Sequence, residues 1–75
     1  MLTILGDRIK EAREELGFSI SDIATRATLS KNQIEQIENG GEKSFYSSAI
    51  KLIAARKVAT ILGLAEDEYL EKSKP

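Results

Sequence analysis

Two short segments with helical spacing, each opened by a serine, follow one another within residues 19–39. Ser19 precedes the first segment and has the acidic Asp22 three residues on, and Ser30 precedes the second and has Gln33 at the same distance. Serine is a preferred N-cap, an acidic residue suits the first helical turn, and S-x-x-Q has the spacing of a capping box. The pattern predicts two short helices joined by a turn of three or four residues.

Apolar residues recur at helical spacing on both sides of this pair, and no segment shows the alternation typical of a strand. The first segment has one apolar stripe, which consists of Leu5, Ile9, Ala12 and Leu16. The longest pattern covers about residues 45–62, and its inward side is expected to contain Ile50, Ile53, Ala54, Ile61 and Leu62. Residues 65–71 are expected to form a short terminal helix, followed by a frayed tail at residues 73–75. The sequence therefore predicts an all-α fold with about five helices.

A chain of 75 residues has material for one hydrophobic core, so residues 1–75 are expected to form a single domain. Its 41% apolar and 31% charged residues are a globular balance and exclude a disordered chain. Because cysteine and histidine are absent, disulfides, zinc fingers, thiol chemistry and histidine general bases are excluded. We expect no enzyme activity, metal, cofactor or small-molecule substrate. No apolar run reaches membrane-spanning length, which favours a cytoplasmic location and leaves a membrane-anchored parent protein open.

The net charge of the chain is −1, whereas dedicated nucleic-acid binders are usually basic. Contact with DNA would therefore have to rest on a local patch. Lys51, Arg56 and Lys57 concentrate positive charge in the long fourth helix, and we interpret them as a solvated face. The alternative is a second contact to phosphates, or to acidic lipid or protein. Phe45 and Tyr46, just before them, are expected to anchor a loop in the core.

The two short central helices have the arrangement of a helix-turn-helix, in which the second helix enters the major groove of DNA. The helix that follows Ser19 would then lie across the DNA backbone and present its N-terminal amides to phosphate. Candidate base contacts are the polar residues near the start of the helix that follows Ser30, namely Ser30, Lys31, Asn32, Gln33 and Gln36. Asparagine and glutamine can pair with adenine, and lysine with guanine. The alternative is that these residues form only the polar outward face of a scaffold helix.

Residues 6–40, GDRIKEAREELGFSISDIATRATLSKNQIEQIENG, resemble the helix-turn-helix of phage repressors of the Cro/XRE type. The shared features are a basic first helix with a glycine-hydrophobe-serine corner, an Ile-Ala pair, a serine-led third helix and a terminal Ile-x-x-Ile-Glu-x-Gly. The resemblance implies a compact five-helix fold like that of lambda repressor, with the helix-turn-helix core at about residues 19–39. It also implies a transcriptional regulator whose partner is double-stranded DNA, and a homodimer that reads two half-sites.

Carried over position by position, the resemblance implies phosphate contacts from Ser19, Asn39 and Lys43. It further implies a largely buried, structural ion pair between Arg13 of the first helix and Glu38 at the end of the third. Glu38 would then point inward and be neutralised, so it would not oppose the binding of DNA.

Three features depart from the repressor pattern. Ile20 stands where repressors usually have a glutamine that contacts phosphate, and we expect it to pack against a neighbouring helix. Thr28 occupies the turn, where the family favours glycine because φ is often positive, so either the turn differs here or stability is lost. The loop after the third helix has Glu42 beside Lys43, and Glu35 is expected to be exposed on that helix. The missing positive charge weakens attraction to phosphate.

The chain also resembles the RodZ-like cell-shape proteins, whose cytoplasmic N-terminal domain belongs to the same superfamily. The shared features are a hydrophobe on each side of Ser19, the non-glycine turn at Thr28 and the segment VATILGL at residues 58–64. This resemblance implies a protein-interaction module of a membrane-anchored protein, with an actin-like filament as partner. The fourth helix of that branch carries aromatics and a glycine, where this chain has Ile53, Ala54 and Val58. Two alternatives therefore stand, a DNA-binding regulator and a filament-binding module.

Overall fold

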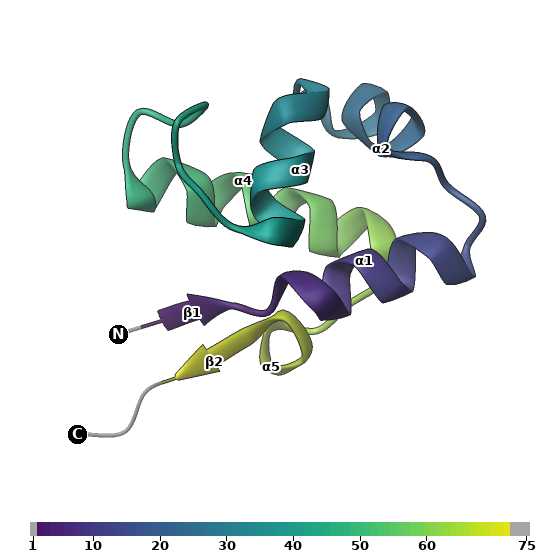
Figure 1. The fold of residues 1–75 in the computed structure, drawn as a ribbon. Helices are drawn as coiled ribbons and strands as arrows, with labels where there is room; N and C mark the ends of the chain where they lie inside the picture. The colour runs from purple at the N-terminus through teal and green to yellow at the C-terminus, as the bar shows by residue number, and fades with distance from the viewer. Residues whose placement is uncertain (1, 73–75) are drawn as a thin grey trace.

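The computed structural model describes residues 2–72, which form five α-helices and a two-stranded antiparallel ribbon (Figure 1). In chain order the elements are β1 (Leu2–Ile4), α1 (Gly6–Glu15), α2 (Ile20–Ala27), α3 (Lys31–Asn39), α4 (Ser48–Leu62), α5 (Glu66–Tyr69) and β2 (Leu70–Lys72). The prediction of an all-α fold with about five helices is confirmed in part, because the described residues form five helices but also two short strands. The predicted frayed tail lies outside them. Within residues 2–72 no helix combines the length and the apolarity that crossing a membrane requires.

The two central helices each begin one residue after a serine that caps them. The Oγ of Ser19 accepts a hydrogen bond from the Asp22 N–H at 3.0 Å, and the Asp22 carboxylate accepts one from the Ser19 N–H at 2.9 Å. Ser30 and Gln33 form the same reciprocal pair at 3.1 and 2.9 Å. Each box satisfies backbone N–H groups that the ends of a helix leave without partners. Local chemistry therefore sets where α2 and α3 begin.

Three helices end in the same backbone motif, with one residue in the left-handed region. The residues are Gly17 after α1, Thr28 after α2 and Gly63 after α4, with φ of 76°, 58° and 76°. In each case the N–H of the next residue donates to the carbonyl five residues back, at 3.1, 2.8 and 2.8 Å. This is the Schellman motif, which glycine adopts without a steric penalty. The turn at Thr28 therefore keeps the usual geometry, and the threonine is strained.

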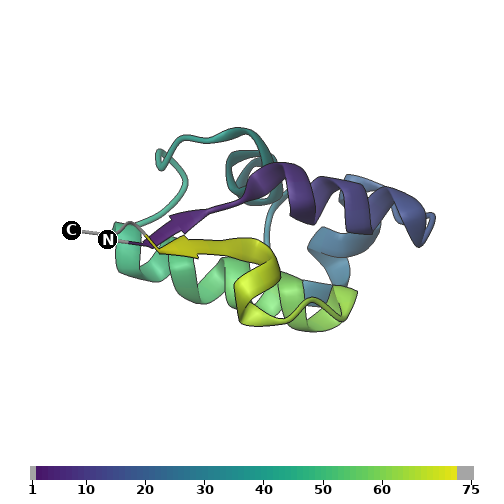
Figure 2. The same ribbon diagram turned by 90° about the horizontal axis from the view of Figure 1, so that it is seen from below.

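The expectation that the chain contains no strand is wrong. Ile4 pairs with Leu70, and the Leu5 N–H donates to the carbonyl of Tyr69 at 2.8 Å, so β1 and β2 lie side by side (Figure 2). The helix predicted for residues 65–71 consequently ends at Tyr69, where the backbone becomes extended. Strands of three residues are too short to show an alternating pattern. Each is extended because the other is beside it, and that neighbour comes from the opposite end of the chain.

The predicted inward side of α4 is confirmed only in part, because Ala54 and Leu62 are buried as predicted but two isoleucines are not. Ile50 and Ile53, predicted to face inward, are 45% and 62% exposed. The buried side consists of Lys51, Ala54, Ala55, Val58, Ala59 and Leu62. Three of these six residues are alanines, whose small side chains allow α4 to pack closely against α1 and α2. Leu16 was predicted to belong to the apolar stripe of the first helix. It is also exposed, by 54%, just before the turn at Gly17.

The segment before α4 also differs from the prediction. The helix begins at Ser48 and not near residue 45, because the Oγ of Ser47 caps it by accepting a hydrogen bond from the Ile50 N–H at 3.2 Å. Phe45 is buried, as predicted, whereas Tyr46 is 91% exposed. Lys51, predicted to be solvated, is buried, with 8% of its surface exposed.

Candidate nucleic-acid interface

The third helix has one buried side and one exposed side. Its buried residues are Ile34, Ile37 and Glu38. Its exposed residues are Lys31, Asn32, Glu35 and Asn39. Residues three and four apart share one face of a helix, so these four polar side chains form a single outer stripe along α3. This stripe is the surface that α3 can present to a groove of DNA.

Gln33 and Gln36 lie between the two sides and hold the loop that joins α3 to α4. The Nε2 of Gln36 donates to the Oγ of Ser44 at 2.9 Å, and its Oε1 accepts from the Ser44 N–H at 2.9 Å. The Nε2 of Gln33 donates to the Ser44 carbonyl at 3.2 Å, while its Oε1 completes the cap of α3. We call these contacts the Ser44 clamp. The loop thus runs back beside α3 (Figure 1).

Three of the five predicted base contacts therefore have partners inside the protein. Ser30 and Gln33 cap α3, and Gln36 binds Ser44 through both of its polar atoms. A base edge would have to replace these bonds. Lys31 and Asn32 are exposed, and their side chains make no hydrogen bond to any other residue within 2–72. The structure leaves these two of the five predicted residues ready for an external partner.

The predicted phosphate site at the start of α2 is occupied by a side chain of the protein. The N–H and the Oγ of Ser19 both bond Asp22, at 2.9 and 3.0 Å. The hydrogen bond from the Ser19 N–H, with that from its side chain, holds the pKa of Asp22 below its ordinary value, so the group is a carboxylate at neutral pH. A phosphate here would meet a negative charge. The neighbouring Ile20 is partly buried against the core, as expected for a packing residue. The other two predicted phosphate contacts, Asn39 and Lys43, are exposed.

Charge on this part of the surface is balanced. In the described segment from α2 to the start of α4, the exposed cations are Arg26, Lys31 and Lys43, and the exposed anions are Asp22, Glu35 and Glu42. The guanidinium carbon of Arg26 lies 4.5 Å from the centre of the Phe18 ring, a distance typical of a cation–π contact. The candidate interface therefore has no surplus of positive charge for the phosphate backbone.

The structure brings Arg13 and Glu38 together, as the resemblance implied. The Nε and Nη2 of Arg13 donate to the two carboxylate oxygens of Glu38 at 2.7 and 3.1 Å, and its Nη1 donates to the Phe18 carbonyl at 2.8 Å. The side chains are 9% and 1% exposed. Hydrogen bonding to Glu38 raises the pKa of Arg13, although burial acts in the opposite direction. The pair joins α1 to the end of α3, so Glu38 cannot face DNA.

A glycine that the sequence reasoning did not single out makes this junction possible. A Cβ on Gly6 would overlap the Glu38 carbonyl oxygen and would lie only 2.7 Å from the Ile37 oxygen. The first turn of α1 therefore packs directly on the last carbonyls of α3, which places a positive helix end against a negative one. The available signal was a glycine inside a helix start, where glycine is intrinsically unfavourable.

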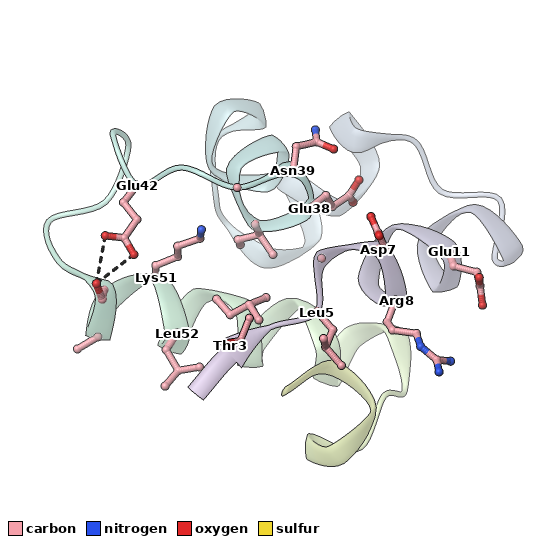
Figure 3. A pocket seen from close by; sticks show the side chains of 16 residues that line it. Thr3, Leu5, Asp7, Arg8, Glu11, Glu38, Asn39, Glu42, Lys51 and Leu52 are labelled. Carbon is pink, nitrogen blue, oxygen red and sulfur yellow. Dashed lines mark hydrogen bonds between the residues drawn. The ribbon is translucent and has the colours of Figure 1, made fainter. Parts of the chain in front are cut away.

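A groove of about 1100 Å³ lies beside this junction, between β1, α1, the end of α3 and the start of α4 (Figure 3). Lys51 of α4 directs its ammonium group into the groove. Four acidic residues line it as well, namely Asp7, Glu11, Glu38 and Glu42, against Arg8 and Lys51 as the basic ones. A phosphate in the groove would meet more acidic than basic groups, so the groove does not extend the candidate interface.

Comparison with known proteins agrees with the arrangement of α2 and α3. A family model described as a helix-turn-helix domain matches residues 6–74 of the chain. The match includes α4 and α5 as well as the central helices. No curated protein and no solved structure matches the chain.

Proposed function

We propose, because this chain belongs to the helix-turn-helix domain family, that it binds double-stranded DNA and acts as a transcriptional regulator. In this proposal α3 lies in the major groove and α2 crosses the backbone, as in a phage repressor. The observation that carries the proposal is the first turn of α3, where Lys31 and Asn32 are exposed on a helix start that a serine caps. Lysine matches the acceptors of guanine, and asparagine matches the paired donor and acceptor of adenine.

Asn39 and Lys43 are the proposed phosphate contacts. Both are exposed, one at the end of α3 and the other in the loop that the Ser44 clamp holds beside it. A clamped loop presents its groups in one geometry, which lowers the entropy lost on binding. Ser19 is not part of this proposal because Asp22 occupies its polar groups.

We further propose that the protein binds DNA as a homodimer. With balanced charge, one copy gains little from the release of counterions, which supplies much of the affinity for DNA. Two copies would read half-sites about one helical turn apart. The contact surface in this proposal consists of Tyr46, just before α4, and of Ile50 and Ile53 in its first two turns, all three exposed. A second copy would remove these apolar side chains from water.

Selection from random duplexes, followed by titration across a salt series, tests DNA binding. We expect a defined sequence preference, and Lys31→Ala should reduce the discrimination at one base pair by about 1–3 kcal/mol. Lys43→Ala should weaken binding to all sequences equally and flatten the dependence on salt by about one ion per copy. Lys10→Ala, an exposed lysine of α1, is the matched control and should change neither. Micromolar or weaker binding without preference, unaffected by Lys31→Ala, would contradict the proposal.

Sedimentation of the protein over a concentration series tests the dimer. The wild-type chain should associate, and Ile53→Lys should remain monomeric because it places a charge in the contact. Thr60→Lys is the matched control, since Thr60 is exposed on the same helix outside the proposed surface. A monomer at all concentrations, with and without DNA, would contradict this part of the proposal.

The exposed apolar end of α4, together with the carboxylate at the start of α2, favours one second candidate. This is a protein-interaction module of the RodZ-like kind, which binds an actin-like filament on the cytoplasmic side of a membrane. Co-sedimentation with polymerised actin-like protein distinguishes the two functions. Filament binding that Ile53→Lys abolishes and Lys31→Ala preserves would support the second candidate and count against the first.

A further inference from the structure

Glu35 lies in the middle of the outer stripe of α3. It is exposed, with Lys31 one turn before it and Asn39 one turn after it. The residue beside it, Gln36, is bound to Ser44 and is directed to the loop. If α3 enters the major groove at all, the carboxylate of Glu35 enters with it. The placement of this acidic group is the feature that a general attraction to DNA does not explain.

We propose that Glu35 is a specificity-determining residue that reads cytosine, an inference that rests on the proposed binding of DNA. An ionised carboxylate can only accept hydrogen bonds. In the major groove, cytosine presents its N4 amino group as a donor, whereas guanine presents two acceptors and thymine an acceptor and a methyl group. Adenine has a donor too, but its N7 acceptor stands next to it and would repel the second carboxylate oxygen. Cytosine is therefore the base that Glu35 matches.

The same carboxylate acts against every other sequence. Its charge is repelled by the phosphates on both sides of the groove, and this repulsion is present on any DNA. Only a correctly placed cytosine offsets it with a hydrogen bond to a charged group. Glu35 thus selects a base and also lowers the affinity for DNA of other sequences. Part of the specificity therefore comes from an unfavourable interaction with the wrong DNA sequence. Balanced charge on the interface is consistent with a protein that discriminates through such repulsion.

The Ser44 clamp explains why the carboxylate has this role in place of a glutamine. Gln33 and Gln36 both have amides that could pair with adenine, yet both hold the loop. The groups of α3 that remain outward are an ammonium in Lys31, an amide in Asn32 and the carboxylate of Glu35. These three match guanine, adenine and cytosine respectively. The geometry therefore assigns the second turn of α3 to cytosine.

Selection from a random duplex library tests this assignment with wild type, Glu35→Gln and Glu35→Ala. Wild type should prefer cytosine by about tenfold or more at one position. Glu35→Gln should change that preference to adenine, because a glutamine amide pairs with N6 and N7. Glu35→Ala should accept all four bases there and bind random duplex more tightly than wild type. Glu14→Gln, an exposed glutamate of α1, is the matched control and should leave the selected sequence unchanged.

The outcomes separate this inference from the function on which it rests. If wild type selects a sequence but both variants select the same one, Glu35 reads no base and the inference is overturned, while DNA binding stands. If wild type selects no sequence, both are overturned. Thermal melts of each variant accompany the selection, and since Glu35 is exposed in α3, the folded state should be retained.

Discussion

Replacement of Arg13 by methionine should be far more damaging than an ordinary loss of charge. Methionine keeps an unbranched apolar side chain in the same space but removes all three hydrogen bonds of the guanidinium. The carboxylate of Glu38, whose side chain is 1% exposed, then has no cation beside it. The carbonyl of Phe18 loses its side-chain donor as well. The folded protein would contain a buried, uncompensated negative charge.

The expected loss is about 3–5 kcal/mol, the usual consequence of removing one partner of a buried ion pair. Folded domains have about 0.05–0.15 kcal/mol of stability per residue, which is roughly 4–11 kcal/mol for a chain of this length. Arg13→Met should therefore remove about a third or more of the stability. The double variant Arg13→Met/Glu38→Met removes both charges, and a buried pair replaced by apolar residues is often neutral. Most of the loss should consequently return when Glu38 is also replaced.

Urea denaturation followed by circular dichroism measures the free energy of unfolding for both single variants and the double variant. The double variant should be several kcal/mol more stable than the sum of the single effects allows. Arg8→Met, an exposed arginine on the same helix, is the control and should change stability by about 0.5 kcal/mol or less. A loss below about 1 kcal/mol for Arg13→Met, or strictly additive effects, would show that the pair does not hold α1 against α3 as described.

Three further outcomes follow from the backbone and the caps. Thr28→Gly should stabilise the folded protein by about 0.5–1 kcal/mol, because relief of the left-handed strain exceeds the added entropy of the unfolded chain. This gain should appear as a higher Tm, and an unchanged or lower Tm would refute the strain. Gly6→Ala should destabilise by about 1–3 kcal/mol in urea denaturation, because its Cβ would meet the carbonyls of α3, and a neutral result would disprove the close contact. The pKa of Asp22 is lowered from 3.8 by its bonds to Ser19, so the cap stabilises the fold above about pH 4 and loses this effect as pH falls through the lowered pKa. Asp22→Asn should remove that part of the pH dependence in melts from pH 2 to 7, and an unchanged profile would contradict the bond.

Features controlled by nearby residues could be read from the sequence. Ser19 and Ser30 begin α2 and α3 because their caps need only residues three positions away. Gly17 and Gly63 end α1 and α4 because the left-handed turn is a local conformation that glycine adopts without strain. Such signals lie within one helical turn, so no tertiary contact is needed to interpret them.

The choice of the buried side of α4 could not be read in the same way. Ile50 and Ile53 are the larger hydrophobes and suggested the inward direction. The packed helix instead buries Ala54, Ala55, Val58 and Ala59 in its middle, where it packs against both α1 and α2. Hydrophobicity is a property of single residues, whereas the space between two helices is a property of their arrangement.

The candidate site divides along the same line. Sequence alone determined that a short capped helix begins after Ser30 with polar residues outward, because helical spacing and capping are local. Only the tertiary structure decided which of those polar residues face out, because the loop after α3 returns beside it and engages both glutamines. It also decided that β1 and β2 pair and that Gly6 contacts α3, since each needs a partner distant in the chain. An outward helix face is fixed by what the rest of the chain leaves uncovered.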